Sequence, residues 1–153
     1  MKIEEQYNKI KQQYNLPDFK QINKLFELTE IECSEELFLV EIRRRIVDKI
    51  EYYSKVLCNV LQPDTNLVSI QEAHVFNEED RKSILTIYKQ LMFIERRSNI
   101  LALDNDDVKT AQFIINTYNK WIEVMPEVVS ILEKIHDSWA KEEDIIEDLG
   151  YLG

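Results

Sequence analysis

Glycine is almost absent from this chain of 153 residues, and its absence restricts the fold more than any other feature. The only two glycines are Gly150 and Gly153, so residues 1–149 contain none. Phosphate-binding loops, dinucleotide-binding turns, EF-hand loops and the nucleophile elbow of hydrolases all need glycine, either for a positive φ or for close approach to a ligand. Tight β-hairpin turns favour it as well. The sequence therefore argues against a β-rich fold and against the common nucleotide-binding and hydrolase classes.

Apolar residues recur at helical spacing along most of the chain, which indicates amphipathic helices. The long helices are predicted at about residues 35–61, 78–103 and 107–148. One or two short helices are expected before residue 28, and another short helical turn at 67–73. The acidic loop at 104–107 is short, so the helices on either side should be antiparallel neighbours. The sequence predicts an all-α, mainly antiparallel helical bundle that forms a single domain over residues 1–153.

The last long helix has the most regular apolar pattern of the chain. Its expected core stripe is Val108, Ala111, Ile115, Tyr118, Ile122, Met125, Val129, Leu132, His136 and Trp139. The pattern widens through Ile114, Trp121, Val128 and Ile135. It also continues across Pro126, and a proline within a helix removes one backbone hydrogen bond. We therefore expect one long helix that is kinked near Pro126.

The same helix carries a second apolar line, formed by Phe113, Val124 and Ile131. Spacings of 11 and 7 residues place these side chains on one side of the helix, nearly opposite the expected core stripe. A helix that is apolar on two sides is either buried within its own fold or meets a partner. Both explanations remain open from the sequence.

The C-terminal residues 142–153 alternate acidic and apolar side chains. The apolar members are Ile145, Ile146, Leu149, Tyr151 and Leu152. Acidic residues at the C-terminal end of a helix oppose its dipole, so we expect this tail to fray unless something basic meets it. One interpretation is a segment that packs back on its own bundle. The other is a segment that docks on another protein.

Metal-binding spacing occurs once, at Glu133 and His136, which match the Glu-x-x-His pair of carboxylate-bridged di-iron bundles. That class needs a second such pair, and the only other histidine, His74, lacks the partner spacing. The acidic loop at 104–107 lacks the glycine and distal glutamate of an EF-hand, so a helix cap explains it better than a calcium site. We therefore expect no cofactor, and a structural role for His136 is the preferred interpretation.

The formal net charge of −10 opposes broad attraction to nucleic acid. Arg43–Arg45 and Arg96–Arg97 are the basic runs, but consecutive helical residues point about 100° apart and do not form one patch. No apolar run approaches the roughly 20 residues that cross a bilayer, and the N-terminus does not have the pattern of a signal peptide. A cytoplasmic location without membrane contact is expected.

These observations favour a non-enzymatic protein–protein interaction or assembly protein, either a homo-oligomer or a subunit of a larger complex. The alternative is a metal-dependent helical-bundle enzyme that uses Glu133 and His136. A second alternative is a nucleic-acid-processing accessory factor that uses the two basic runs, which the acidic balance disfavours.

Overall fold

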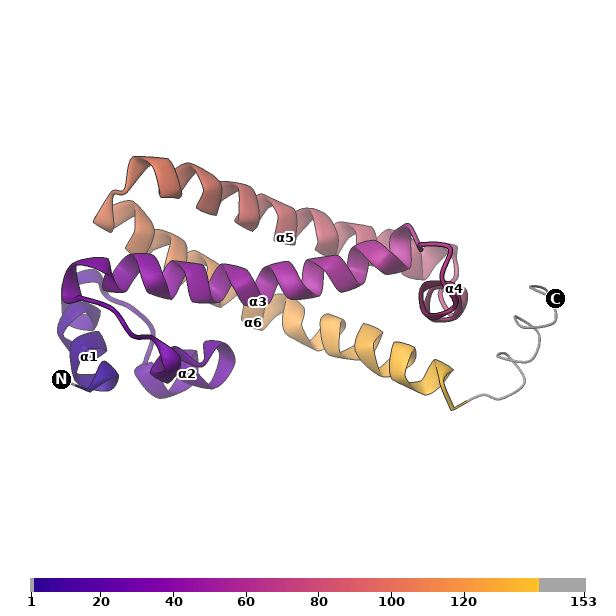
Figure 1. Cartoon of the computed structure of the whole chain (residues 1–153), viewed down its shortest axis with the longest axis horizontal. Coiled ribbons are helices and arrows are strands. Elements are labelled where there is room, and N and C mark those ends of the chain that lie inside the picture. Colours follow the sequence, from indigo (N-terminus) through magenta and orange to yellow (C-terminus); the bar gives the residue numbers. More distant parts are fainter. Residues whose placement is uncertain (1, 141–153) are drawn as a thin grey trace. The chain divides into compact units, whose positions relative to one another are not determined.

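The computed structural model describes residues 2–140, and all regular secondary structure in this range is helical (Figure 1). The predicted all-α fold is therefore confirmed. The α-helices are α1 (Ile3–Tyr14), α2 (Phe19–Phe26), α3 (Phe38–Leu61), α4 (Leu67–His74), α5 (Glu78–Asp104) and α6 (Asp107–Ser138). Two 3₁₀ turns, Leu28–Glu30 and Glu35–Leu37, precede α3.

The long helices lie close to their predicted positions, with differences at two ends. The third helix begins as a 3₁₀ turn at residues 35–37 and becomes α-helical at Phe38. The last helix ends at Ser138, where Trp139 and Ala140 donate backbone hydrogen bonds to carbonyls three residues back. The predicted extension to residue 148 lies almost entirely outside the described residues.

Pro126 lies within α6, which continues through it as one helix. The prediction of a single long helix, rather than two, is confirmed for Asp107–Ser138. Because proline has no N–H, one backbone carbonyl a turn earlier loses its helical donor. The kink itself stays a prediction.

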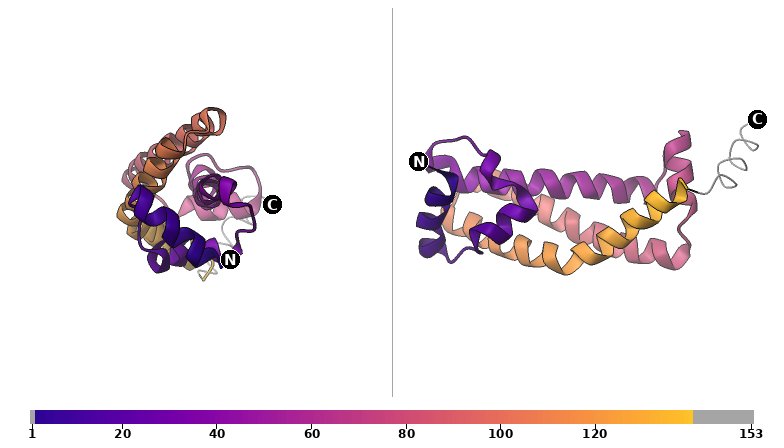
Figure 2. Two further views of the ribbon diagram at one scale, coloured as in Figure 1. Left: turned by 90° about the vertical axis from the view of Figure 1, so that its left-hand side faces the viewer. Right: turned by 90° about the horizontal axis from the view of Figure 1, so that it is seen from below.

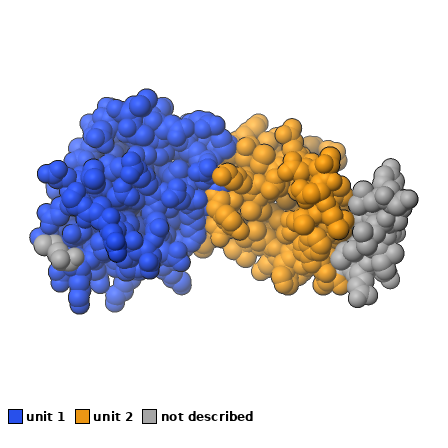
Figure 3. Space-filling model, in the orientation of Figure 1, with its two compact units in different colours: residues 1–51, 92–123 blue, residues 52–91, 124–153 orange. Residues whose placement is uncertain are grey.

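The structure divides into two compact units, coloured separately in Figure 3. Unit 1 contains residues 1–51 and 92–123, and unit 2 contains residues 52–91 and 124–153. Each of the three long helices contributes one part to each unit. In both units the chain direction reverses between α3 and α5 and again between α5 and α6 (Figure 1). The prediction of a single domain stays a prediction.

Within unit 1, α1 and α2 pack together next to the unit's own parts of α3 and α6 (Figures 1 and 2). Tyr7 is fully buried, and its hydroxyl donates to the carbonyl of Pro17 at 2.6 Å. Burial raises the pKa of this phenol, so it stays a neutral donor. The hydroxyl of Tyr118 in α6 donates to the side chain of Gln21 in α2 at 3.2 Å. The first bond joins α1 to the segment that precedes α2, and the second attaches α2 to α6.

Within unit 2, polar contacts connect the short helix α4 to its neighbouring helices near their ends. Gln71 donates to the carbonyl of Ser138 at 3.1 Å, and the indole of Trp139 donates to Glu72 at 2.9 Å. Arg81 in α5 donates to the carbonyls of Val60 and Ala73, at 3.1 and 3.2 Å. These carbonyls lie at or near the ends of α3 and α4, where the regular helical hydrogen bonds end. The carbonyl of Ala73 also accepts from the N–H of Phe76 at 3.3 Å.

Among residues 2–140, which contain no glycine, three residues take the left-handed conformation that glycine usually adopts. Asn15, Glu27 and Asn105 have φ of 57°, 55° and 56°, and each ends a helix. Asparagine adopts this conformation more readily than other residues with a Cβ atom, whereas glutamate does not. The acidic loop at 104–107 is thus a pair of helix ends, and the carboxylate of Asp106 accepts from the N–H of Lys109 at 2.9 Å. This confirms the helix-cap interpretation of that loop.

The core stripe predicted for the last helix is displaced by one residue. Ile114, Trp121, Val128 and Ile135 are buried, whereas Ile122, Val129 and His136 are exposed. A displacement of one residue corresponds to a rotation of about 100° around an α-helix. The observed core face therefore includes the apolar residues that were expected only to widen the stripe, and it excludes most of the predicted stripe itself. By contrast, six positions of α5 that recur at helical spacing are all buried. They are Ile84, Ile87, Leu91, Ile94, Ser98 and Leu101.

Candidate interaction face on helix α5

Large apolar side chains lie exposed on the part of α5 that belongs to unit 1. Phe93 is 76% exposed, Ile100 55% and Leu103 91%. Phe93 and Ile100 are two helical turns apart, about 10 Å along the axis, and Leu103 follows about one turn later. Together with Arg96 and Arg97, which share the same side of the helix, we call these residues the α5 face. An aligned apolar group of this kind is typical of a surface that meets another molecule.

The charge of the α5 face is opposite to that of the chain. The exposed residues from 93 to 103 are Phe93, Arg96, Arg97, Asn99, Ile100, Ala102 and Leu103, none of them acidic. The whole chain has 29 acidic and 19 basic residues. Aromatic residues and arginine are also the residue types that contribute most to protein–protein binding. The face is therefore suited to an acidic partner with apolar side chains.

At the end of α5, the acidic side chain of Asp104 is already paired with a lysine. Its carboxylate lies 2.7 Å from the ammonium of Lys109, and this hydrogen bond raises the pKa of that lysine. The nearby positive charge of Arg97 acts on the same pKa in the opposite direction. Because Lys109 neutralises Asp104, the carboxylate does little to offset the arginines of the α5 face.

The opposite side of this helical segment is fixed to α3 by a buried arginine. Arg43 is 6% exposed, and its guanidinium donates to the carbonyl of Ser98 at 3.1 Å and to its hydroxyl at 2.6 Å. Burial lowers the pKa of Arg43, since desolvation disfavours the charged form. Hydrogen bonds from a charged donor in a buried position are strong. The helical segment that carries the α5 face is thus anchored to α3 through Ser98.

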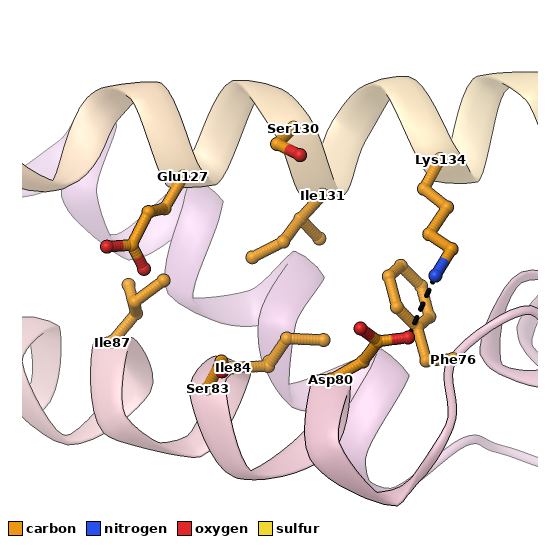
Figure 4. Close-up of a pocket in the computed structure, with 9 residues that line it drawn as sticks. All are labelled: Phe76, Asp80, Ser83, Ile84, Ile87, Glu127, Ser130, Ile131 and Lys134. Atoms are coloured by element: carbon orange, nitrogen blue, oxygen red, sulfur yellow. Dashed lines mark hydrogen bonds and ion pairs between the residues drawn. The ribbon is translucent and has the colours of Figure 1, made fainter.

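Unit 2 contains a separate pocket of about 230 Å³ between the first part of α5 and the last part of α6. Figure 4 shows Ile84 and Ile131 pointing toward one another across it, with Glu127 at one end and Lys134 at the other. The ammonium of Lys134 lies 2.8 Å from the carboxylate of Asp80. It also lies 5.4 Å from the centre of the Phe76 ring. The pocket is small, and its ammonium is already paired.

Asp80 has a structural role that explains this pairing. Its carboxylate accepts from the N–H of Asn77 at 3.1 Å, and the side chain of Asn77 accepts from the N–H of Asp80 at 2.9 Å. This reciprocal arrangement is a capping box at the start of α5. The hydrogen bond from Lys134, followed by that from Asn77, lowers the pKa of Asp80. We interpret the pocket as a junction that joins the α5 cap to α6, not as a ligand site.

The apolar line predicted as a possible partner contact lies inside the chain. Phe113, Val124 and Ile131 are all buried. Their positions coincide with the observed core face of α6, which is rotated from the predicted one. Burial is therefore the explanation that holds for these three side chains, and none of them offers a large exposed surface.

The predicted metal pair lies on the surface. The His136 side chain is 86% exposed, and its ring Nδ1 lies 3.1 Å from the carboxylate of its neighbour Asp137. Glu133 is exposed as well. Within residues 2–140, no three histidine, cysteine, aspartate or glutamate side chains are grouped closely enough to hold a metal ion. The expectation that His136 lies on the core stripe is wrong, because that stripe is displaced.

The first basic run is divided among three different environments. Arg43 is buried against Ser98, while Arg44 pairs with Glu41 at 2.7 Å. The Nε of Arg45 donates to the carbonyl of Glu27 at 3.4 Å. The run therefore forms no continuous basic patch, as its spacing predicted. Arg96 and Arg97, the second run, are both exposed and belong to the α5 face.

The remaining predicted contact residues are in the C-terminal tail. Ile145, Ile146, Leu149, Tyr151 and Leu152 lie outside the described residues. The α5 face was absent from the sequence predictions, although a signal for it was present. Phe93, Ile100 and Leu103 fall outside the regular core stripe of their helix, in the same way as the second apolar line of α6.

In the part of the chain that the structure describes, no helix is both long enough and apolar enough to cross a membrane. Comparisons with protein-family models, with curated proteins and with solved structures find no match for this chain.

Proposed function

We propose that this chain is a non-enzymatic protein–protein interaction or assembly protein that binds its partner through the α5 face. The observation that carries the proposal is the exposure of Phe93, Ile100 and Leu103 around two arginines, with no exposed acid from residue 93 to 103. On a chain with a net charge of −10, such a face attracts acidic proteins, and copies of this chain are among them. The cytoplasmic location expected from the sequence belongs to the same proposal.

The size of the face is consistent with a real but modest contribution to binding. Full burial of a large apolar side chain is worth about 1.5–3 kcal/mol. Because the three apolar residues of the face are between 55% and 91% exposed, burying their accessible parts supplies on the order of 3–7 kcal/mol before association costs. Those costs are of comparable size. The arginines and the rest of the interface must therefore contribute to a stable complex. We expect binding to weaken as salt concentration rises.

Site-specific photo-crosslinking in cells tests this proposal directly. A photoreactive phenylalanine analogue is placed at Phe93, and at Val68 on α4 as the matched control. Both positions are exposed and apolar, but Val68 belongs to unit 2, whereas the α5 face belongs to unit 1. We expect a discrete crosslinked product from position 93 and none of the same mass from position 68. No product from position 93, or identical products from both positions, would refute the proposal.

A loss-of-binding variant complements the crosslink. Phe93→Ser with Ile100→Ser should weaken the crosslinked complex at least about tenfold, the loss typical of residues at the centre of an interface. Both side chains are exposed, so the free energy of unfolding should change little. Val68→Ser supplies the control for removal of an exposed apolar side chain.

A further inference from the structure

We propose that the partner on the α5 face is the C-terminal segment of a second copy of this chain, residues 142–152. This inference rests on the proposed function and names the occupant of the same face. The segment lies outside the described residues and follows α6 almost directly.

Charge complementarity is the first argument for this occupant. The segment contains five acidic residues, Glu142, Glu143, Asp144, Glu147 and Asp148, and no basic one. The exposed surface from residue 93 to 103 contains two arginines and no acid. Opposite charges that face each other at an interface accelerate association and select the correct partner.

Apolar spacing is the second argument. Ile145 and Leu152 are seven residues apart in the segment, with Leu149 between them. Phe93 and Ile100 are seven residues apart on the α5 face, with Arg96 and Arg97 between them. The acidic Glu147 and Asp148 occupy the corresponding interval of the segment. Anchors separated by four and seven residues are typical of a segment that lies along a helical surface.

Symmetry favours a second copy over an unrelated protein. Every chain carries one acidic segment and one α5 face, so two chains can exchange segments around a two-fold axis. Such an exchange makes the contact twice. Two linked contacts bind much more tightly than one short segment does alone, because the second forms within an existing complex.

The test uses two full-length charge-reversal variants. The face variant is Arg96→Glu with Arg97→Glu, and the tail variant is Glu147→Lys with Asp148→Lys. The control for the face variant is Lys20→Glu with Lys24→Glu, which makes the same change of net charge at exposed positions of α2. The dimer dissociation constant is measured by analytical ultracentrifugation for each protein alone and for the two variants mixed in equal amounts.

We expect the wild-type chain and the α2 control to dimerise with similar affinity. Each charge-reversal variant alone should dimerise at least about tenfold more weakly, because like charges then meet at both contacts. The mixture should recover the wild-type affinity to within about threefold, since acidic segments meet basic faces and basic segments meet acidic faces. Recovery on mixing can arise only from a contact between two copies.

Three results would overturn this inference. They are a wild-type chain that stays monomeric, variants that dimerise normally, or a mixture that does not recover. A monomeric chain whose Phe93 still crosslinks to a different protein overturns the inference but leaves the proposed function standing. A monomeric chain without any crosslink at Phe93 overturns both this inference and the proposed function.

Discussion

Replacing Glu27 by glycine should stabilise the protein, because this residue holds a left-handed backbone conformation that a Cβ atom disfavours. Glu27 has φ of 55° and ψ of 52° at the end of α2. Its N–H donates to the carbonyl of Asn23 at 2.8 Å, and its own carbonyl accepts from Arg45 at 3.4 Å. These contacts are made by the backbone, so the substitution keeps them. The side chain is exposed, so little packing is lost with it.

The magnitude follows from two opposing effects. The left-handed conformation costs a residue with a Cβ atom roughly 1–2 kcal/mol, which glycine does not lose. Glycine also gains freedom in the unfolded chain, which costs about 0.4–1 kcal/mol. We therefore expect the free energy of unfolding to rise by about 0.5–1 kcal/mol. In a domain of this size that corresponds to an increase in Tm of about 1–4 °C.

Urea denaturation followed by circular dichroism measures this change, and Glu30→Gly is the matched control. Glu30 is also an exposed glutamate, three residues further along, and it does not have a positive φ. At position 30, glycine relieves no strain and only increases the freedom of the unfolded chain. We therefore expect the free energy of unfolding to fall by about 0.5–1 kcal/mol. If Glu27→Gly destabilises the protein, or if both variants change its stability in the same direction, the left-handed conformation of Glu27 does not cost the energy that we assign to it.

Three further predictions concern the other contacts. Arg43→Ala should lower the free energy of unfolding by about 1.5–3 kcal/mol, because it removes charge-assisted bonds to a buried serine. The control Arg44→Ala, at an exposed position, should change it by less than about 0.5 kcal/mol. Equal effects of the two variants in urea denaturation would contradict the buried role of Arg43. The pKa of Asp80 is lowered in the folded state, so the unfolded chain binds more protons and the contribution of Asp80 to stability is lost as pH falls through its folded pKa. Asp80→Asn should therefore flatten the fall in urea midpoint between neutral and acidic pH. Finally, the chain should pass through a heparin column at physiological salt, because two exposed arginines cannot offset a net charge of −10; salt-sensitive retention would instead support the nucleic-acid alternative.

The helical pattern of α5 was sufficient to predict its buried side, whereas that of α6 was not. In α5 most core positions also have an apolar neighbour, but a stripe displaced by one residue would have to include Glu95 or Arg97. In α6, apolar residues occur in adjacent pairs, such as Ile114 with Ile115 and Val128 with Val129. Two helical stripes one residue apart then satisfy the periodicity equally well. Only the neighbouring helices decide which stripe is buried.

The interaction face shows a different limit of sequence interpretation. Phe93, Ile100 and Leu103 lie outside the core stripe of α5, and that much can be read from their spacing. The same argument applied to Phe113, Val124 and Ile131, which the structure shows to be buried. An off-stripe apolar residue is a surface residue only if no other helix covers it. That information comes from tertiary packing and is not contained in the spacing.

The chain passes from one unit to the other inside helices and not through flexible linkers. The chain passes from one unit to the other between residues 51 and 52 in α3, 91 and 92 in α5, and 123 and 124 in α6. Insertion of one residue at any of these points would rotate every later side chain of that helix by about 100° relative to the earlier ones. An insertion after residue 51, for example, would turn Leu57 and Val60 away from the core they now share. Over evolutionary time, changes in chain length should therefore be confined to the few loops, while the helices vary only by substitution.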